Sequence, residues 1–173
     1  IEQVQVKYIE TVARRYNFDG YHQFDFLTTE LDKYPTGEII RQISIEINKI
    51  RPDYIYLNHN SDVHSDHKIA FDAVYSCTKN FRYPHINRIY LYETLSETEF
   101  APALGNNLFV PNVFSDITLY LDEKIKIMQL FTTEQMNEPY PRAISSIEAL
   151  ARYRGSRIGV KYAEAFQLIF MND

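Results

Sequence analysis

Apolar residues that switch between helical and extended spacing constrain the fold of this chain more than any other feature. One helix face has an apolar residue every three or four positions, at Ile39, Ile40, Ile43, Ile47 and Ile50. That helix must end before Pro52, and residues 53–59 form a β-branched and aromatic run typical of a strand. A second helical pattern at residues 69–77 and a second strand pattern at residues 87–93 follow. This order predicts an α/β fold in three layers, with a mostly parallel sheet and helices on both faces.

The patterns outside this central part extend the same architecture. Helical spacing is present from the first residues, so we expect the chain to open inside a helix and a strand region to be missing before it. The other expected elements are a short strand at 21–27, an irregular stretch at 94–111, a strand at 112–118, a helix at 121–134 and a strand at 163–170. Ser145 and Glu148 resemble a capping box that opens one more helix, whose pattern continues through Gly155 and Gly159. Nothing marks a domain boundary, so residues 1–173 are expected to form one Rossmann-like domain.

Composition excludes several classes of protein. Of the 173 residues 45% are hydrophobic and 24% are charged, as in an ordinary globular protein. The net charge is -5 and the basic residues are scattered, which argues against a nucleic-acid partner. No apolar stretch approaches the roughly 20 residues that a membrane span needs. The single cysteine, Cys77, lies in an apolar helical pattern, which indicates a buried thiol in a reducing, cytoplasmic compartment.

Potential metal ligands are concentrated between the central strand and the helix after it. Three of the five histidines fall within residues 59–67, together with Asp62 and Asp66. Imidazole nitrogens and carboxylate oxygens are the ligands that Zn²⁺ takes in catalytic sites. His64 and His67 are three residues apart at a helix start, so their rings can point to the same region. The alternative is a polar loop in which Ser65 or Asp66 caps the helix and the histidines are solvated, and spacing alone leaves this open.

Two segments together resemble one enzyme family. Asp62-Val-His-Ser-Asp-His67, after Arg51-Pro-Asp-Tyr-Ile-Tyr56, is similar to the second signature of the LmbE/PIG-L metal-dependent N-deacetylases. The segment from Glu148 to Phe166, which contains Arg-Tyr-Arg-Gly-Ser-Arg-Ile-Gly-Val-Lys-Tyr-Ala-Glu-Ala-Phe, is similar to the family's C-terminal segment. Pieces between them fit as well, so the resemblance covers nearly the whole chain.

The resemblance implies a site with Zn²⁺ or another divalent metal ion. In the family a His and an Asp of a first motif, Ala-His-Pro-Asp-Asp-Glu, and the last His of the second motif hold the metal. Only that last ligand, His67, is present here, and the first motif, which also supplies the general base, is absent from the sequence. His64 resembles the histidine that stabilises the oxyanion or protonates the leaving amine, and Asp66 resembles the carboxylate that orients it.

The expected reaction is therefore hydrolytic N-deacetylation of an N-acetylglucosamine-type sugar or glycan precursor. Asp62, Arg154 and Tyr162 are candidates for contact with that sugar, although packing explains Arg154 at least as well. Two alternatives stay open: an inactive fragment with a sugar-binding or assembly role, and a metal-dependent phosphoesterase. The sequence contains no G-x-x-x-x-G-K-[ST] loop to hold a phosphate, which speaks against the second. Assembly into a homo-oligomer is left open.

Overall fold

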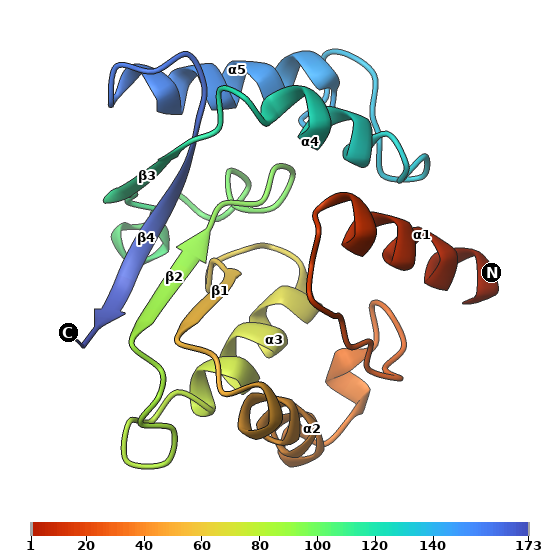
Figure 1. Ribbon diagram of the computed structural model, residues 1–173, viewed down its shortest axis with the longest axis vertical. Coiled ribbons are helices and arrows are strands. Elements are labelled where there is room, and N and C mark those ends of the chain that lie inside the picture. Colours follow the sequence, from red (N-terminus) through yellow and green to blue (C-terminus); the bar gives the residue numbers. More distant parts are fainter. Residues whose placement is uncertain (1, 173) are drawn as a thin grey trace. The chain divides into compact units, whose positions relative to one another are not determined.

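The computed structural model describes residues 2–172 of the chain, and side chains from residue 8 onward (Figure 1). The helices in this part are α1 (Glu2–Arg15), α2 (Thr36–Ile50), α3 (Ser65–Ser76), α4 (Leu121–Met128) and α5 (Ile144–Ser156). The strands are β1 (Tyr54–Asn58), β2 (Arg88–Tyr92), β3 (Val113–Asp116) and β4 (Ala163–Met171). Short 3-10 helices lie at η1 (Leu31–Lys33) and η2 (Gly105–Asn107). The fold is a mixed α/β fold with an open four-stranded sheet, consistent with the Rossmann-like class that the sequence predicted.

The chain divides into two compact units, which are described separately. The first unit consists of the residues up to Phe24 and of Asp116–Glu164, and it contains α1, α4 and α5. The second unit consists of Asp25–Ser115 and the residues from Ala165 onward, and it contains α2, α3, β1 and β2. The expectation of a single domain stays a prediction. Among the described residues, no helix is both long and apolar enough to cross a membrane.

The sheet has the strand order β1-β2-β4-β3 and contains both parallel and antiparallel pairs. β1 and β2 are parallel, with Tyr54 opposite Arg88 and Asn58 opposite Tyr92. β2 and β4 are antiparallel, so the parallel arrangement that the sequence predicted holds for β1 and β2 but does not extend to β4. The apolar pattern of residues 163–170 is the same for either direction of the strand, and it therefore could not reveal this difference.

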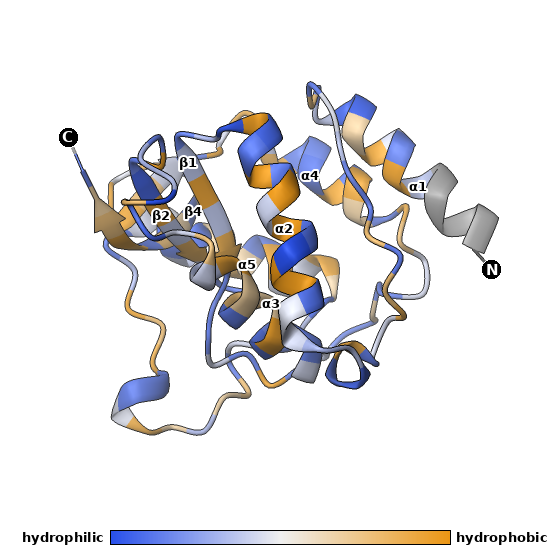
Figure 2. Cartoon of the chain, turned by 90° about the horizontal axis from the view of Figure 1, so that it is seen from below, coloured by the Kyte–Doolittle hydropathy of each residue, from blue (hydrophilic) through white to orange (hydrophobic). Residues whose placement is uncertain are grey.

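The core of the second unit lies between the β1–β2 pair and the helices α2 and α3. Ile55 and Leu57 of β1 are buried, whereas Tyr54 and Tyr56, which alternate with them along the strand, are exposed. The buried members of this core are Ile47, Ile55, Leu57, Cys77, Tyr83, Ile86, Ile89 and Leu91. Figure 2 shows hydrophobic and hydrophilic residues alternating along α2, whose apolar face contributes Ile47. Ile50, expected on this face, is the last residue of the helix and is exposed.

Three local predictions differ from the structure. Residues 21–27 form no strand, and Phe26 of this segment instead packs edge-on against Tyr34, with ring centroids 4.9 Å apart. The helix expected at 121–134 ends at Met128, and turns continue to residue 134. The expected capping box does not form, because α5 begins at Ile144 and its N-terminus has no side-chain cap.

The C-terminal end of α5 also differs from the helical pattern. The helix ends at Ser156, and Gly159 lies beyond it with a φ of +75°, in the left-handed region. Gly155 does allow a close backbone approach, as predicted, since a Cβ built on it would lie 2.6 Å from the carbonyl oxygen of Val160. The irregular stretch at 94–111 is confirmed, with only η2 inside it.

Candidate active site

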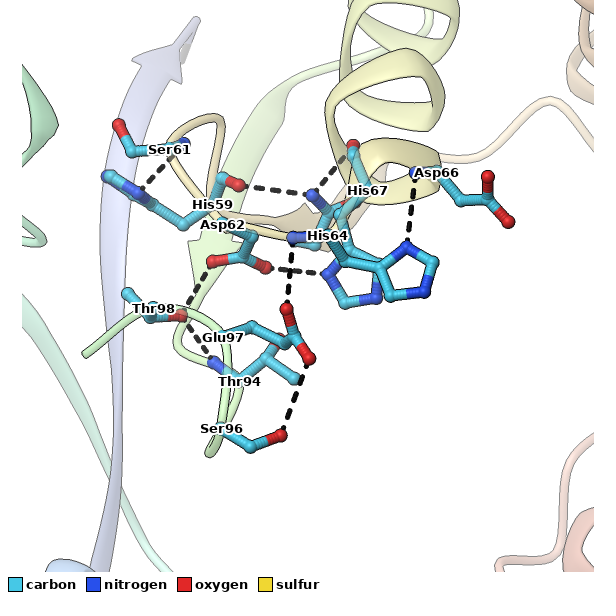
Figure 3. A network of polar contacts seen from close by, with 11 residues as sticks. His59, Ser61, Asp62, His64, Asp66, His67, Thr94, Ser96, Glu97 and Thr98 are labelled. Carbon is cyan, nitrogen blue, oxygen red and sulfur yellow. Dashed lines mark hydrogen bonds and ion pairs between the residues drawn. The ribbon is translucent and has the colours of Figure 1, made fainter. Parts of the chain in front are cut away.

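The candidate site is the loop between β1 and α3, at the carboxyl end of β1, where ligands gather in open α/β sheets (Figure 3). The side-chain amide of Asn58, the last residue of β1, donates to the carbonyl of His59 at 3.1 Å and to that of His67 at 2.9 Å. These hydrogen bonds link the end of β1 to the first turn of α3. His59, Ser61 and Asp62 are buried in the second unit, whereas Asn60 and Val63 of the same loop are exposed.

His67 is held by a buried carboxylate. Its Nδ1 lies 2.8 Å from Oδ2 of Asp62, which has no exposed surface. The other oxygen of Asp62, Oδ1, accepts a hydrogen bond from the hydroxyl of Thr98 at 2.7 Å. The hydrogen bond with Asp62 raises the pKa of His67, and burial acts in the opposite direction. A proton on Nδ1 leaves the lone pair of Nε2 available, which is the arrangement found when a carboxylate orients a metal-binding histidine.

His64 is the N-cap of α3. Its Nδ1 accepts a hydrogen bond from the backbone N–H of Asp66 at 3.1 Å, which satisfies one of the free N–H groups of the first turn. The cap is therefore neither Ser65 nor Asp66, the two residues that a plain polar loop would have used. In the neutral imidazole this bond leaves the proton on Nε2. The rings of His64 and His67 lie side by side, with centroids 5.2 Å apart, so the expected convergence of these two residues is found.

The carboxylate of Asp66 points to a different partner from the expected one. It accepts backbone hydrogen bonds from Thr29 at 2.6 Å and from Leu31 at 3.2 Å, and so anchors the turn before η1. The contact between Asp66 and His64 is made by the main chain of Asp66. The orienting role expected for the Asp66 carboxylate from the family pattern stays a prediction.

Two residues of the segment after β2, Glu97 and Thr98, belong to the site and were not identified from the sequence. The carboxylate of Glu97 accepts the backbone N–H of His64 at 3.0 Å, and its carbonyl accepts the N–H of Val63 at 3.4 Å. Thr98 holds Asp62. Their sequence signal was weak: polar residues follow a predicted strand directly, at the edge of the sheet where parallel strands end together.

His59 has surroundings unlike those of the other two histidines. It is only 2% exposed, and burial lowers its pKa. Its Nδ1 accepts the backbone N–H of Ser61 at 3.2 Å, and its ring meets Phe109 edge-on at 5.6 Å between centroids. These contacts are those of a packed core histidine.

The described residues fit one metal ligand and its supporting carboxylate. His67 can offer Nε2 to a cation, with Asp62 behind it. A catalytic Zn²⁺ ion generally takes three protein ligands and keeps a fourth position open. No group of three or more His, Cys, Asp or Glu side chains able to hold a metal occurs among the residues that the structure describes. A complete site would therefore need ligands in addition to His67.

The three candidates for substrate contact differ in their surroundings. Asp62 is buried, and its two oxygens are hydrogen-bonded to His67 and Thr98. It could contact a substrate only if one of these two side chains moved away. Arg154 and Tyr162 belong to the first unit, and their role in binding stays a prediction. Tyr162 is buried and donates its hydroxyl proton to Glu148 at 2.8 Å, while the guanidinium of Arg154 lies 5.4 Å from the ring centroid of Tyr153.

No protein-family model matches the sequence, and neither does any curated protein. Solved structures do match the fold. The conserved protein TT1542 from Thermus thermophilus has a TM-score of 0.77 at 18% identity, and the match covers 100% of this chain and 76% of that one. The N,N'-diacetylchitobiose deacetylase from Pyrococcus horikoshii has a TM-score of 0.70 at 20% identity, covering 96% of this chain and 63% of that one. The A40926 pseudoaglycone deacetylase Dbv21 has a TM-score of 0.70 at 16% identity, covering 99% and 72%.

Two further structures with this fold bear on its chemistry. The teicoplanin deacetylase Orf2, described in a zinc-inhibited form, has a TM-score of 0.58 at 15% identity, covering 90% of this chain and 59% of that one. The 4-carboxy-2-hydroxymuconate hydratase GalB from Pseudomonas putida KT2440 has a TM-score of 0.63 at 13% identity, covering 99% and 73%. The fold thus carries deacetylases and at least one hydratase, and at these identities the likeness is one of fold.

Proposed function

We propose that this chain belongs to the LmbE/PIG-L N-deacetylases and that its protein hydrolyses the N-acetyl group of an N-acetylglucosamine-type sugar. The observation that carries the proposal is the pairing of His67 with the buried Asp62 beside the ring of His64. These residues belong to the motif that resembles the family's second signature. The three deacetylases among the similar structures support the reaction class, and the chitobiose deacetylase supports an N-acetyl sugar as its substrate.

In the proposed site Nε2 of His67 would hold a divalent metal ion such as Zn²⁺. Such an ion would polarise the acetamide carbonyl and lower the pKa of a water molecule bound to it. Asp62 keeps the proton of His67 on Nδ1 and fixes the plane of the ring, because both of its own oxygens are bonded. In the family the remaining ligands and the general base come from a first motif that the printed sequence lacks, so the roles proposed for this chain are those of His67, Asp62 and His64.

His64 is proposed to stabilise the oxyanion that forms when the acetamide carbonyl is attacked. Its Nδ1 is engaged by the backbone N–H of Asp66, so its neutral ring has Nε2–H as the donor. The helix start holds this donor in place before the reaction begins. One hydrogen bond of this kind to an oxyanion contributes about 10²- to 10³-fold to the rate.

A second candidate is a protein that binds an N-acetyl sugar without hydrolysing it. The observation in its favour is that only one ligand of the expected metal site is found in the described part of the chain. A phosphoesterase has less support, because the sequence lacks the phosphate-binding loop named above.

Product analysis separates these functions. The 173-residue chain and the protein encoded by its complete reading frame would each be incubated with N,N'-diacetylchitobiose and with a phosphate monoester, with and without added Zn²⁺. The proposal predicts acetate and free amine from the sugar, dependent on the metal and abolished by His67→Ala in the complete protein. Binding of the sugar without acetate release would favour the second candidate, and release of phosphate alone would overturn the proposal.

A further inference from the structure

We propose that Thr98 is a positioning residue for His67: its hydroxyl, acting through Asp62, sets the tautomer and the orientation of the imidazole. The chain of contacts runs from the backbone N–H of Thr94 to the hydroxyl of Thr98 at 2.7 Å, then to Oδ1 of Asp62 at 2.7 Å. From Oδ2 of Asp62 it continues to Nδ1 of His67 at 2.8 Å. Figure 3 shows these contacts in one continuous series.

The direction of the Thr98 hydroxyl is determined by its partners. A threonine hydroxyl has one proton to donate and lone pairs with which to accept. Because the N–H of Thr94 can only donate, the hydroxyl accepts there, and its single proton is directed to Asp62. Asp62 as a carboxylate can only accept, so the bond on its other side takes its proton from Nδ1 of His67.

The position of Thr98 is also fixed by the turn that contains it. The backbone N–H groups of Glu97 and Thr98 both donate to the carbonyl of Thr94, at 3.0 and 2.9 Å. Glu97 joins this turn to the loop after β1, because it accepts the N–H of His64 with its carboxylate and the N–H of Val63 with its carbonyl. The hydroxyl of Thr98 is therefore held against Asp62 by the main chain.

Asp62 has no exposed surface, so a water molecule cannot take the place of a lost hydrogen-bond donor. A buried carboxylate that loses one of its hydrogen bonds incurs the full desolvation penalty of that oxygen. Removal of the Thr98 hydroxyl should therefore disturb Asp62, and through it the proton on Nδ1 of His67. The expected effect on catalysis rests on the proposed function, in which His67 is a metal ligand. The expected effect on the tautomer and orientation of the His67 imidazole does not depend on that function.

Two threonines of the same turn make a matched pair of variants. Thr98→Val removes the donor to Asp62 and keeps the shape of the side chain. Thr94→Val makes the same chemical change at the start of the turn, at a buried hydroxyl that has no hydrogen-bond partner among the described residues. Thr98→Ser keeps the hydroxyl and should restore the wild-type behaviour.

The experiment is imidazole ¹⁵N NMR of the 173-residue chain without metal, with the backbone spectrum as a check of folding. The wild type, Thr98→Ser and Thr94→Val should show His67 with its proton on Nδ1, in slow exchange with water. Thr98→Val should lose or broaden this signal. An unchanged signal in Thr98→Val, or an equal loss in Thr94→Val, would overturn the inference. If Thr98→Val does not fold, Thr98→Cys, whose thiol is a weak donor, takes its place with the same two criteria.

A second measurement keeps the inference distinct from the proposed function. In the protein from the complete reading frame, loss of an outer hydrogen bond to a metal ligand typically lowers metal affinity about 10- to 100-fold. We expect this loss in Thr98→Val and not in Thr94→Val. Failure of the wild-type protein to release acetate, with the NMR response intact, would overturn the proposed function and leave the positioning role of Thr98 in place.

Discussion

Replacement of Gly155 by alanine should destabilise the protein, although alanine is the better helix former. Gly155 is buried in the last turn of α5, and the chain folds back over it, with the N–H groups of Ile158 and Val160 donating to its carbonyl at 3.1 Å each. A Cβ at this position would lie 2.6 Å from the carbonyl oxygen of Val160 and 3.0 Å from that of Lys161. Both neighbours are backbone atoms, so neither can turn aside as a flexible side chain could.

The size of the effect follows from two opposing terms. Alanine gains about 1 kcal/mol over glycine from helix propensity. Overpacking a fixed site typically costs about 1–3 kcal/mol, and contact with backbone at this distance places the cost near the upper end of that range. The net loss is about 2 kcal/mol, which for a chain of this length lowers Tm by roughly 4–8 °C.

The assay is thermal unfolding followed by circular dichroism, with Gly37→Ala as the control. Gly37 lies near the start of α2, and a Cβ there would meet nothing within 4 Å. Because Gly37 is only the second residue of the helix, that variant should be at least as stable as the wild type. A Gly155→Ala protein that melts at or above the wild-type Tm would refute the reasoning about this close approach.

Three further predictions concern other parts of the chain. The hydrogen bond from Tyr162 is the largest cause of the lowered pKa of Glu148. Tyr162→Phe should therefore raise the pKa of Glu148 toward its ordinary value, as measured by NMR titration of the carboxyl group. An unchanged pKa would contradict this. Burial raises the pKa of Cys77, so its thiol should react with a disulfide reagent only slowly in the native protein and rapidly in denaturant. Arg51 caps α2 at a φ of +53°, and Arg51→Gly should raise Tm because glycine adopts this conformation without steric cost; a lower Tm would argue against strain at this cap.

The helices and strands around the site were predictable because buried residues recur along each of them at a regular spacing. Ile55 and Leu57 alternate with exposed tyrosines, and this period of two is visible in the sequence as a strand. Residues 21–27 have a similar aromatic content, yet no neighbouring strand among the described residues pairs with them. Propensity alone could not reveal this, because a strand is completed by partners far away in the sequence.

The part of the candidate site that depends on local geometry was predictable, and the part that depends on the sheet was not. His64 and His67 converge because a spacing of three residues at a helix start brings side chains to one side, which is local geometry. Thr98 reaches Asp62 only because β1 and β2 are parallel and end together, with Asn58 opposite Tyr92. That register depends on the whole sheet, so the sequence indicated a binding loop after residue 93 without indicating which of its residues would contact the site.

The most direct test of the account is the zinc content and the deacetylation rate of two variants of the protein from the complete reading frame. His67→Ala should lose bound zinc and activity together, because it removes the one metal ligand that we assign to this chain. His64→Ala should keep its zinc and lose roughly 10²- to 10³-fold in rate, because it removes only the donor to the oxyanion. Loss of zinc from His64→Ala with retention by His67→Ala would reverse the two roles, and full activity in both variants would contradict the account.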